Sequence, residues 1–437
     1  MISSRPLSQK EIALFFFPLL LNVQLMSVSH SIINGALARL DDFVTALAAF
    51  SVAMVLHLFV ASPSYQNHTI TIAMVRGRRS LFGTTIFVTL VACLVSILLA
   101  LLAFTPVGLF LLGNVLGVSG KVASGALEVL AILVFLPFFT GFRGLFQGLV
   151  IRARRTALVS LSTGVRVVAL FAMLALGAPW YSGPELGAVA LLGCIVVETA
   201  FMGFFAWRCH LPATGEEEKS TLEILRYAFP LAYSSCLQQT IPLQINAIIG
   251  RLPDGELALA AFGVIRGFIF LLAGPMRNLQ QAYLTLVRDH EDYQTLVRFF
   301  LWVGGGTGLV MLLTAFPLNK LILGQLMGIE GSMRAYITWP MAACTVFPLL
   351  YGAANLLRGF FAGAHRTALL GRSTIYKAFF LLVCWVLSLL APLPFPGVAQ
   401  AIALLLLAES LEAWYLLRQR RRLYPDFEHL PDSNLPG

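Results

Sequence analysis

The sequence predicts an all-α polytopic membrane protein, with twelve transmembrane helices in two parallel six-helix repeats around a central cavity. Charged residues make up only 12% of the 437 residues, against about 25% in a typical soluble chain. Apolar runs of about 20 residues recur along the whole length, as membrane-spanning helices require. The second half of the chain also repeats the first in register. Because there is too little charge to cover a large soluble core, lipid must be the solvent for most of the surface.

Pro, Gly and charged clusters separate the apolar runs and set the bounds of the predicted spans. The first run follows Arg5 and Lys10 and lacks a small-residue cleavage site, so we expect it to be retained as a span. The twelve predicted spans are 11–37, 44–75, 80–111, 123–151, 156–179, 186–208, 221–250, 256–287, 296–323, 333–362, 367–391 and 397–418.

The Lys and Arg residues lie mainly in one alternate set of loops, which predicts that these loops are cytoplasmic. The opposite set holds only Arg39, Lys121, Arg251, Lys320 and Arg334. An even number of spans then places both termini in the cytoplasm, and we expect the plasma (cell inner) membrane. The polar segment 209–220 is the predicted linker between an N-lobe, 1–208, and a C-lobe, 221–423. We expect the cytoplasmic tail 424–437 to be poorly ordered.

The internal repeat appears when the chain is shifted against itself. The first two spans of each half align when 212 is added to the residue number, and the later spans align when 211 is added. One deleted residue therefore preserves the register over most of each half. The aligned pairs include Asn34 with Asn246, Arg39 with Arg251, Pro63 with Pro275, Pro106 with Pro317, Arg166 with Lys377, and Glu198 with Glu409. Parallel repeats of this kind place a substrate site between the halves in transporters.

Polar residues gather at the same two spans of each half, 11–37 and 44–75 in the first and 221–250 and 256–287 in the second. Because polar groups are unfavourable in lipid, we expect them to line the cavity and bind substrate. The alternative is hydrogen bonding between helices without ligand contact. These candidates are Gln24, His30, Asn34, His57, Gln66, Asn67, His68, Gln239, Gln244, Asn246, Asn278 and Gln281.

Pro63 and Pro275 each free a carbonyl one turn back, which permits a kink. We expect either a hinge or a static kink at these two positions. Nearby, Arg266 and Arg277 complete the predicted substrate site together with His57 and His68. Because no acidic residue lies at mid-depth in these spans, the site suits an anion, and Arg offers a planar fork for carboxylate or phosphate.

Two acidic residues, Glu198 and Glu409, are expected deep in the membrane. Each lies on a span next to one that carries a basic residue at similar depth, Arg166 or Lys377. An unpaired charge at that depth is unfavourable, so we predict the ion pairs Arg166–Glu198 and Lys377–Glu409. A clamp within each lobe is the favoured role, and a proton-coupling carboxylate is the alternative.

Several function classes are excluded or left without support. The net charge is +9, but the Lys and Arg residues cluster between spans and are not interleaved with aromatic residues. We therefore expect no nucleic-acid partner. The chain has no HExxH motif, no paired carboxylates near a His and no phosphate loop, so we expect no enzyme activity, no metal and no cofactor. The expected partners are the lipid bilayer, a small anionic substrate and a coupling ion, H⁺ or Na⁺, and we expect a monomer.

The order and spacing of several short motifs carry a family resemblance. They are FPLLLNV at 17–23, INGALARL ending at Leu40, ASP at 61–63, YAFPLA at 227–232, the Asn246 to Arg251 spacing, GP at 274–275 and AES at 408–410. With them the whole chain resembles the multidrug/oligosaccharidyl-lipid/polysaccharide (MOP) exporter superfamily. It is most similar to the progressive ankylosis (ANK) proteins and more distantly to MATE transporters. ANK-type proteins carry basic residues where this chain has Gln239 and Pro242.

The resemblance implies a secondary transporter that works by alternating access and exports an organic or phosphorylated anion, of the citrate, nucleotide or pyrophosphate class. One alternative is a flippase for an anionic lipid-linked precursor, and another is a MATE-type multidrug exporter. A MATE-like coupling acid cannot be carried over, because span 11–37 has Asn22, Gln24 and Asn34 instead. A sensor or scaffold without transport also stays open.

Overall fold

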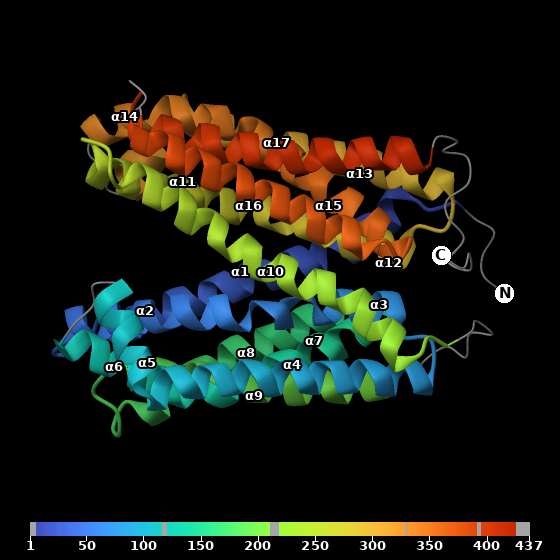
Figure 1. Cartoon of the computed structure of the whole chain (residues 1–437), viewed down its shortest axis with the longest axis horizontal. Helices are drawn as coiled ribbons and strands as arrows, with labels where there is room; N and C mark the ends of the chain where they lie inside the picture. The colour runs from blue at the N-terminus through green and yellow to red at the C-terminus, as the bar shows by residue number, and fades with distance from the viewer. Residues whose placement is uncertain are drawn as a thin grey trace. The chain divides into compact units, whose positions relative to one another are not determined.

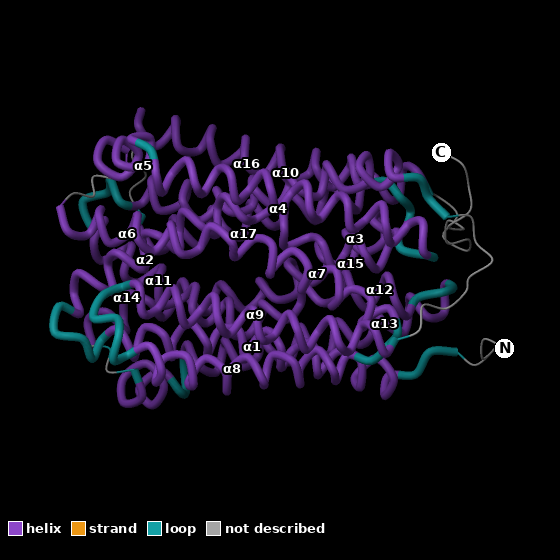
Figure 2. The backbone as a smooth tube through the Cα atoms, turned by 90° about the horizontal axis from the view of Figure 1, so that it is seen from below, coloured by secondary structure: helices purple, strands orange, loops and turns teal. Residues whose placement is uncertain are grey.

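The computed structural model describes residues 6–115, 120–209, 218–327, 329, 331–390 and 395–424. Within these ranges the backbone forms helices, turns and short loops, with no strand (Figure 2). Residues 210–217 of the predicted linker and residues 425–437 of the predicted tail lie outside the described part.

In the first half of the chain most predicted spans are single helices or pairs of helices joined by a short 3-10 turn. Their bounds are α1 Gln9–Leu37, α2 Phe43–Ala61, η1 Ser62–Gln66, α3 Asn67–Met74, α4 Arg78–Phe104, α5 Pro106–Phe110, η2 Leu111–Val115, α6 Gly120–Ile132, η3 Leu133–Phe135, α7 Leu136–Arg152, α8 Thr156–Gly177 and α9 Glu185–Arg208.

Within the described residues the second half follows the same order of elements, except that it has no helix that matches α5. Figure 1 labels the α-helices of both halves. Its elements are α10 Thr221–Ile249, α11 Gly255–Ala273, η4 Gly274–Arg277, α12 Asn278–Leu286, α13 His290–Ala315, η5 Lys320–Leu326, α14 Gly331–Ala343, η6 Cys344–Val346, α15 Phe347–Gly363, α16 Thr367–Leu390 and α17 Gly397–Leu423.

The helix bounds confirm the internal repeat. Adding 212 to the first and last residue numbers of α1 and α2 gives the bounds of α10 and α11. Adding 211 to those of α6 and α7 gives the bounds of α14 and α15. The turn that follows α7 has Arg154 at φ 58°, and the turn after α15 has the aligned residue, His365, at φ 55°. A left-handed backbone is uncommon for residues other than Gly, so its recurrence at matched positions reflects a common local structure.

Two compact units divide the chain at places that differ from the predicted lobes. The first-half unit is Phe17–Cys236, and the second-half unit is Met1–Phe16 together with Leu237–Gly437. The boundaries therefore fall inside α1 and α10 instead of at the linker 209–220. The start of α1 belongs to the second-half unit because the Leu7 amide donates to Asp292 Oδ1 at 2.9 Å, and Phe16 packs edge-on against Phe299.

The first-half unit holds the start of α10 by an equivalent contact. The backbone amide of Ser80 donates to Glu218 Oε2 at 2.8 Å. Ser80 and Asp292 correspond when 212 is added, because the start of the third span still follows the first offset. The same corner of each repeat therefore receives the segment that leads into α1 or α10, through a carboxylate on Asp292 in one unit and on Glu218 in the other. The sequence alone did not indicate this exchange of helix starts between the units.

Eleven of the described helical segments are long and apolar enough to cross a membrane, by length and composition. This confirms the predicted fold class, a polytopic all-α membrane protein. The helix α10 is not among the eleven although it is 29 residues long. Its polar residues, which include Gln238, Gln239 and Gln244, lower its hydropathy, so the predicted span 221–250 stays a prediction.

Two predicted spans end earlier than expected. The helix α4 stops at Phe104, before Thr105 and Pro106, and α13 stops at Ala315, before Pro317. The predicted bounds 80–111 and 296–323 ran through these prolines and are wrong there. The physical reason is that Pro lacks the N–H needed to continue a helix but fits its first turn, as Pro106 does at the start of α5.

Glycines on α7 and α15 allow the broken second helix of each half to pack closely. A methyl group added to Gly148 would lie 2.5 Å from Thr71 Cβ in α3, and one added to Gly359 would lie 2.7 Å from Tyr283 Cβ in α12. Neither separation is possible for real atoms, so both positions require Gly. Thr71 and Tyr283 are themselves aligned by the repeat, so the close contact recurs in both units.

Candidate functional site

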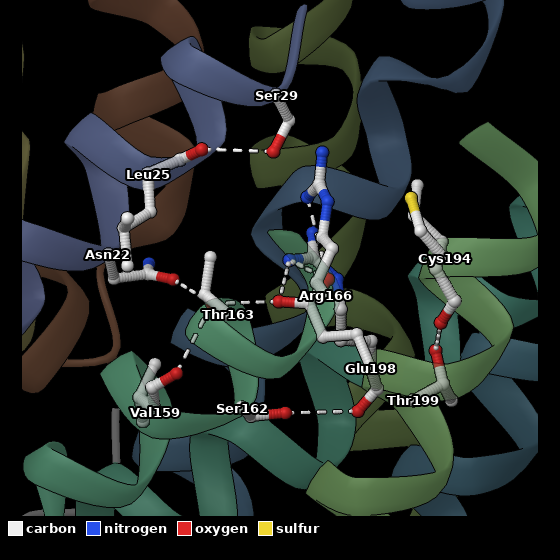
Figure 3. Close-up of polar contacts among 12 residues, drawn as sticks. Asn22, Leu25, Ser29, Val159, Ser162, Thr163, Arg166, Cys194, Glu198 and Thr199 are labelled. Atoms are coloured by element: carbon white, nitrogen blue, oxygen red, sulfur yellow. Dashed lines mark hydrogen bonds and ion pairs between the residues drawn. The ribbon is translucent and has the colours of Figure 1, made fainter. Parts of the chain in front are cut away.

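The first-half unit buries a charge cluster formed by Arg143 on α7, Arg166 on α8 and Glu198 on α9. Figure 3 shows Arg166 and Glu198 with their polar neighbours. Arg143 Nη1 lies 3.3 Å from both Glu198 oxygens, and Arg166 Nη1 lies 3.4 Å from Oε2. Only 1% of Glu198 and 2% of Arg166 is exposed. The helices α8 and α9 pack along each other, which brings the side chains of Arg166 and Glu198 together.

Neutral groups complete the shell around Glu198. The hydroxyl of Thr163, one turn before Arg166, lies 2.8 Å from Glu198 Oε1 and 2.6 Å from Asn22 Oδ1 on α1. Ser162 donates to the backbone carbonyl of Glu198 at 3.1 Å (Figure 3). Both carboxylate oxygens therefore lie within reach of donors, so the carboxylate is held in one geometry.

The formal charges of the first cluster do not balance. Two guanidinium groups share one carboxylate, and the Nε atoms of Arg143 and Arg166 are buried without a hydrogen-bond partner among the described residues. His30 lies within the electrostatic reach of Arg166, and His57 within that of His30. The two guanidinium groups and one carboxylate therefore give this cluster a formal charge of +1.

The second-half unit buries a different cluster at the matching place. It consists of Arg358 on α15, Lys377 on α16, and Glu409 and Glu412 on α17. Arg358 Nε donates to Glu412 Oε1 at 2.7 Å, and Arg358 also contacts Thr374 Oγ1 at 3.4 Å. Lys377 Nζ bridges the two acids, contacting Glu409 Oε1 and lying 3.1 Å from Glu412 Oε2. Two cations here meet two acids, so the formal charges balance.

Both expected ion pairs, Arg166 with Glu198 and Lys377 with Glu409, lie within contact distance. A further buried acid, Glu412, was not among the candidates; it is 1% exposed and bridges Arg358 and Lys377. Glu412 lies close to the basic end of α17, so the sequence did not indicate that it is buried in a charge cluster. One signal was available: Glu412 follows Glu409 by three residues, which puts both on one helix face.

The remaining candidates separate by exposure. Asn67, whose amide donates to the Gly141 carbonyl at 3.3 Å, packs inside the first-half unit. Gln244 hydrogen-bonds within α10 to Thr240 Oγ1 at 3.1 Å. The structure buries His57, Asn67, Asn278 and Gln281; it leaves Gln24, His30, Gln66, His68, Gln239, Gln244 and Asn246 half-buried; and it exposes Asn34, Arg266 and Arg277.

The candidate hinges lie at 3-10 turns. Pro63 is in η1, between α2 and α3, and Pro275 is in η4, between α11 and α12. Both prolines therefore interrupt a span without ending it. For the part of the chain with described side chains, no group of three or more His, Cys, Asp or Glu residues is placed to hold a metal ion.

Solved structures of known transporters share this architecture. The chain matches a MOP superfamily transporter from Pyrococcus furiosus with a TM-score of 0.70 and 15% identity, over 95% of both chains. An outward-facing MATE family multidrug resistance transporter of the MOP superfamily matches with a TM-score of 0.71 and 16% identity, again over 95% of both. The fold is that of the MATE transporters.

A eukaryotic MATE transporter, AtDTX14, gives a TM-score of 0.73 at 13% identity over 94% of each chain. No family model matches the sequence, and no curated protein matches it. At identities this low the likeness to MATE structures establishes the fold, while substrate and coupling must be argued from the residues of this chain.

Proposed function

We propose that this chain is a secondary active transporter that works by alternating access and exports an organic or phosphorylated anion, of the citrate, nucleotide or pyrophosphate class. The MATE-type fold and the eleven apolar segments support a transporter. The anionic substrate is supported by the placement of two exposed arginines, Arg266 and Arg277, in the second-half unit.

Both arginines lie deep within the apolar segment Leu257–Leu286. Each is nine residues from one end of it (266 − 257 and 286 − 277), or about 13 Å at about 1.5 Å per residue. A guanidinium exposed to hydrocarbon at such depth is strongly unfavourable, so exposed arginines there belong on a water-filled surface. A cation-lined aqueous surface attracts a carboxylate or phosphate, which Arg can bind through two parallel hydrogen bonds.

Similar solved structures are compatible with an anionic substrate and with alternating access. The Pyrococcus furiosus transporter is described as having a binding pocket of reverse polarity that suggests a different function. Two further similar structures are described as MATE in the bent conformation and MATE in the straight conformation. We extend both ideas to this chain as part of the proposal: a cationic substrate surface, and movement between two conformations.

The same proposal includes the finer expectations from the sequence. They are a close kinship to ANK-type proteins, cytoplasmic termini, a monomer in the plasma (cell inner) membrane, lobes joined near 209–220, and coupling to H⁺ or Na⁺. A MATE-type multidrug exporter is the main alternative, because the fold of this chain is shared with multidrug transporters. A flippase for an anionic lipid-linked precursor would use the same arginines.

The assignment of Arg277 is tested by transport after substitution. Arg277→Ala removes the guanidinium that binds the anion, so counterflow of labelled citrate, ATP or pyrophosphate in proteoliposomes should fall about ten-fold or more, which corresponds to ~1.4 kcal/mol. Arg277→Lys keeps the positive charge but loses the planar guanidinium that can donate two parallel hydrogen bonds, so it should give an intermediate transport rate.

The matched control is Arg372→Ala, which removes an exposed arginine of α16 outside the proposed site and should leave the rate unchanged. Unaltered anion transport by a folded Arg277→Ala protein would remove Arg277 from the site.

A further inference from the structure

The charge cluster of the first-half unit buries more positive charge than negative charge. Arg143 and Arg166 both contact the single carboxylate of Glu198, so one of the two positive charges has no acidic partner. None of the three residues is more than 7% exposed. A buried net charge is strongly unfavourable unless an opposite charge accompanies it, so the cluster requires a further negative charge.

Gain or loss of protons does not remove this excess charge. A guanidinium stays protonated at every ordinary pH, and protonation of Glu198 or of a nearby histidine only adds positive charge. Cys194, which lies within the electrostatic reach of Arg166, donates its thiol proton to the Leu191 carbonyl at 3.2 Å and is therefore neutral. The compensating charge must come from another acidic residue or from a bound anion.

Among the described residues of the first-half unit, the other acids lie far along the chain from the cluster. Glu185 precedes Glu198 by thirteen residues (198 − 185) on α9, and Glu128 precedes Arg143 by fifteen (143 − 128) on the span that contains α6 and α7. At about 1.5 Å per residue these separations are about 20 Å. The remaining described acids of this unit lie before α2 or at the entrance to α10, and they are Asp41, Asp42, Glu218 and Glu223.

Two buried donors of the cluster are available to an anion. The Nε atoms of Arg143 and Arg166 have no hydrogen-bond partner in the part of the chain with described side chains. In a guanidinium the Nε–H bond points away from Nη1, which is the atom that contacts Glu198 in both arginines. An anion that accepts from either Nε therefore leaves Glu198 in place. On α2, which packs against α9, Nδ1 of the buried His57 also lacks a described partner.

The second-half unit shows how the same framework compensates a second buried cation. There Arg358 and Lys377 meet two acids, Glu409 and Glu412, and the formal charges balance. The residue aligned with Glu412 in the first half is Phe201. The first-half unit thus carries a second cation without the second acid.

We propose that a chloride ion binds to the first-half charge cluster at Arg143 and Arg166, and supplies the negative charge that Glu412 supplies in the second half. A monovalent anion brings the formal charge from +1 to zero, whereas a divalent phosphate or sulfate would make it negative. A spherical ion can also accept single N–H donors from separate helices, while a carboxylate or phosphate is bound best by two parallel donors of one guanidinium.

The chloride site is distinct from the proposed substrate surface at Arg266 and Arg277, and it does not depend on the transport function. Its role is to stabilise the first-half unit, because an ion that binds only the folded protein shifts the folding equilibrium toward that state.

Binding of radioactive chloride to the purified full-length protein in detergent, without any organic anion, tests the site. We expect saturable binding and a melting temperature that rises with chloride but not with gluconate at equal ionic strength, which separates binding from charge screening. Binding that does not saturate, or equal melting temperatures in chloride and in gluconate, would overturn the proposal.

Arg143→Ala introduces the residue type that the second half has at the aligned position, Ala354, and leaves one cation with one acid. It should weaken chloride binding about ten-fold or more, because a charge-assisted hydrogen bond and the net charge are both lost. The chloride-dependent rise in melting temperature should disappear with it. Arg143→Gln keeps a long polar side chain and neutralises the cluster in the same way, so it serves if the Ala variant does not fold.

The matched control is Arg372→Ala, which removes an exposed arginine of α16 and should keep chloride binding. Chloride binding that survives unchanged in a folded Arg143→Gln protein, or that Arg277→Ala removes, would place the ion elsewhere and overturn the proposal. Neither measurement uses transport, so a negative chloride result leaves the transporter proposal standing, and absence of anion counterflow leaves the chloride site standing.

Discussion

At the scale of single residues, one buried ion pair recurs in both halves, and each half surrounds it with different partners. Arg166 with Glu198 and Lys377 with Glu409 have the same separation in sequence, and their place on neighbouring antiparallel helices brings each pair together. Three further residues enlarge the clusters and have no charged equivalent in the other half. They are Arg143, Arg358 and Glu412, and the aligned residues are Ala354, Gln147 and Phe201. Self-similarity could not reveal partners that only one repeat carries.

A residue-scale prediction concerns Asp254, in the connection between α10 and α11. The hydroxyl of Tyr336 and the amide of Gly397, at 2.8 Å, donate to its Oδ2 and hold the pKa of Asp254 below its usual range. A carboxyl group with a depressed pKa stabilises the fold above its ordinary pKa, and this contribution is lost as the pH falls through the lowered value.

Tyr336→Phe removes one of these donors. We expect it to destabilise the fold near neutral pH by about 1 kcal/mol, because Asp254 is partly exposed. The loss of stability on acidification should become smaller, because the pKa of Asp254 in the fold then lies closer to its value in the unfolded chain. Melting temperatures in detergent across acidic to neutral pH check this. Tyr376→Phe, which alters an exposed tyrosine of α16, is the control, and identical pH profiles for Tyr336→Phe and the unaltered protein would contradict the account.

At the scale of elements, hydropathy located the helices, and proline chemistry decided where they break. Pro63 and Pro275 lie inside spans that continue through a 3-10 turn, whereas Pro106 and Pro317 follow helices that stop. The sequence did not distinguish these outcomes, because the difference depends on whether neighbouring helices support the chain on both sides. In the first-half unit, α3 packs along α7 next to Pro63, which keeps the span in place.

A prediction at this scale concerns Gly148 and Gly359, which pack against the helices α3 and α12. Gly148→Ala places a methyl group 2.5 Å from Thr71 Cβ, and Gly359→Ala places one 2.7 Å from Tyr283 Cβ, so each should force α3 or α12 away. We expect a loss of about 1–3 kcal/mol for either substitution, as overpacking gives. Thermal unfolding of the purified variants measures it.

The control for this pair is Gly164→Ala in α8, where an added methyl group meets nothing within 4 Å. That substitution should be neutral or slightly stabilising, by up to about 1 kcal/mol, because Ala favours the helix. Equal stabilities for all three variants would show that the close helix contacts are not required.

At the scale of the whole molecule, the sequence predicted the duplicated all-α membrane fold, and the matching helix bounds and the MATE neighbours bear it out. The exchange of the starts of α1 and α10 between the compact units was not predictable. It depends on contacts such as Leu7 with Asp292 between segments 285 residues apart, and no local pattern reports these. Of the predicted substrate residues, Arg266 and Arg277 are exposed deep in a span, while Asn67 packs inside its unit.

The central claim is that this fold moves an anion, and counterflow with the purified chain in proteoliposomes tests it most directly. Vesicles loaded with unlabelled citrate, ATP or pyrophosphate should accumulate the same labelled anion from outside, and vesicles loaded with a lipophilic cation should not accumulate labelled cation. Accumulation of the cation alone, or of neither class by a protein that remains folded in the vesicles, would contradict the account.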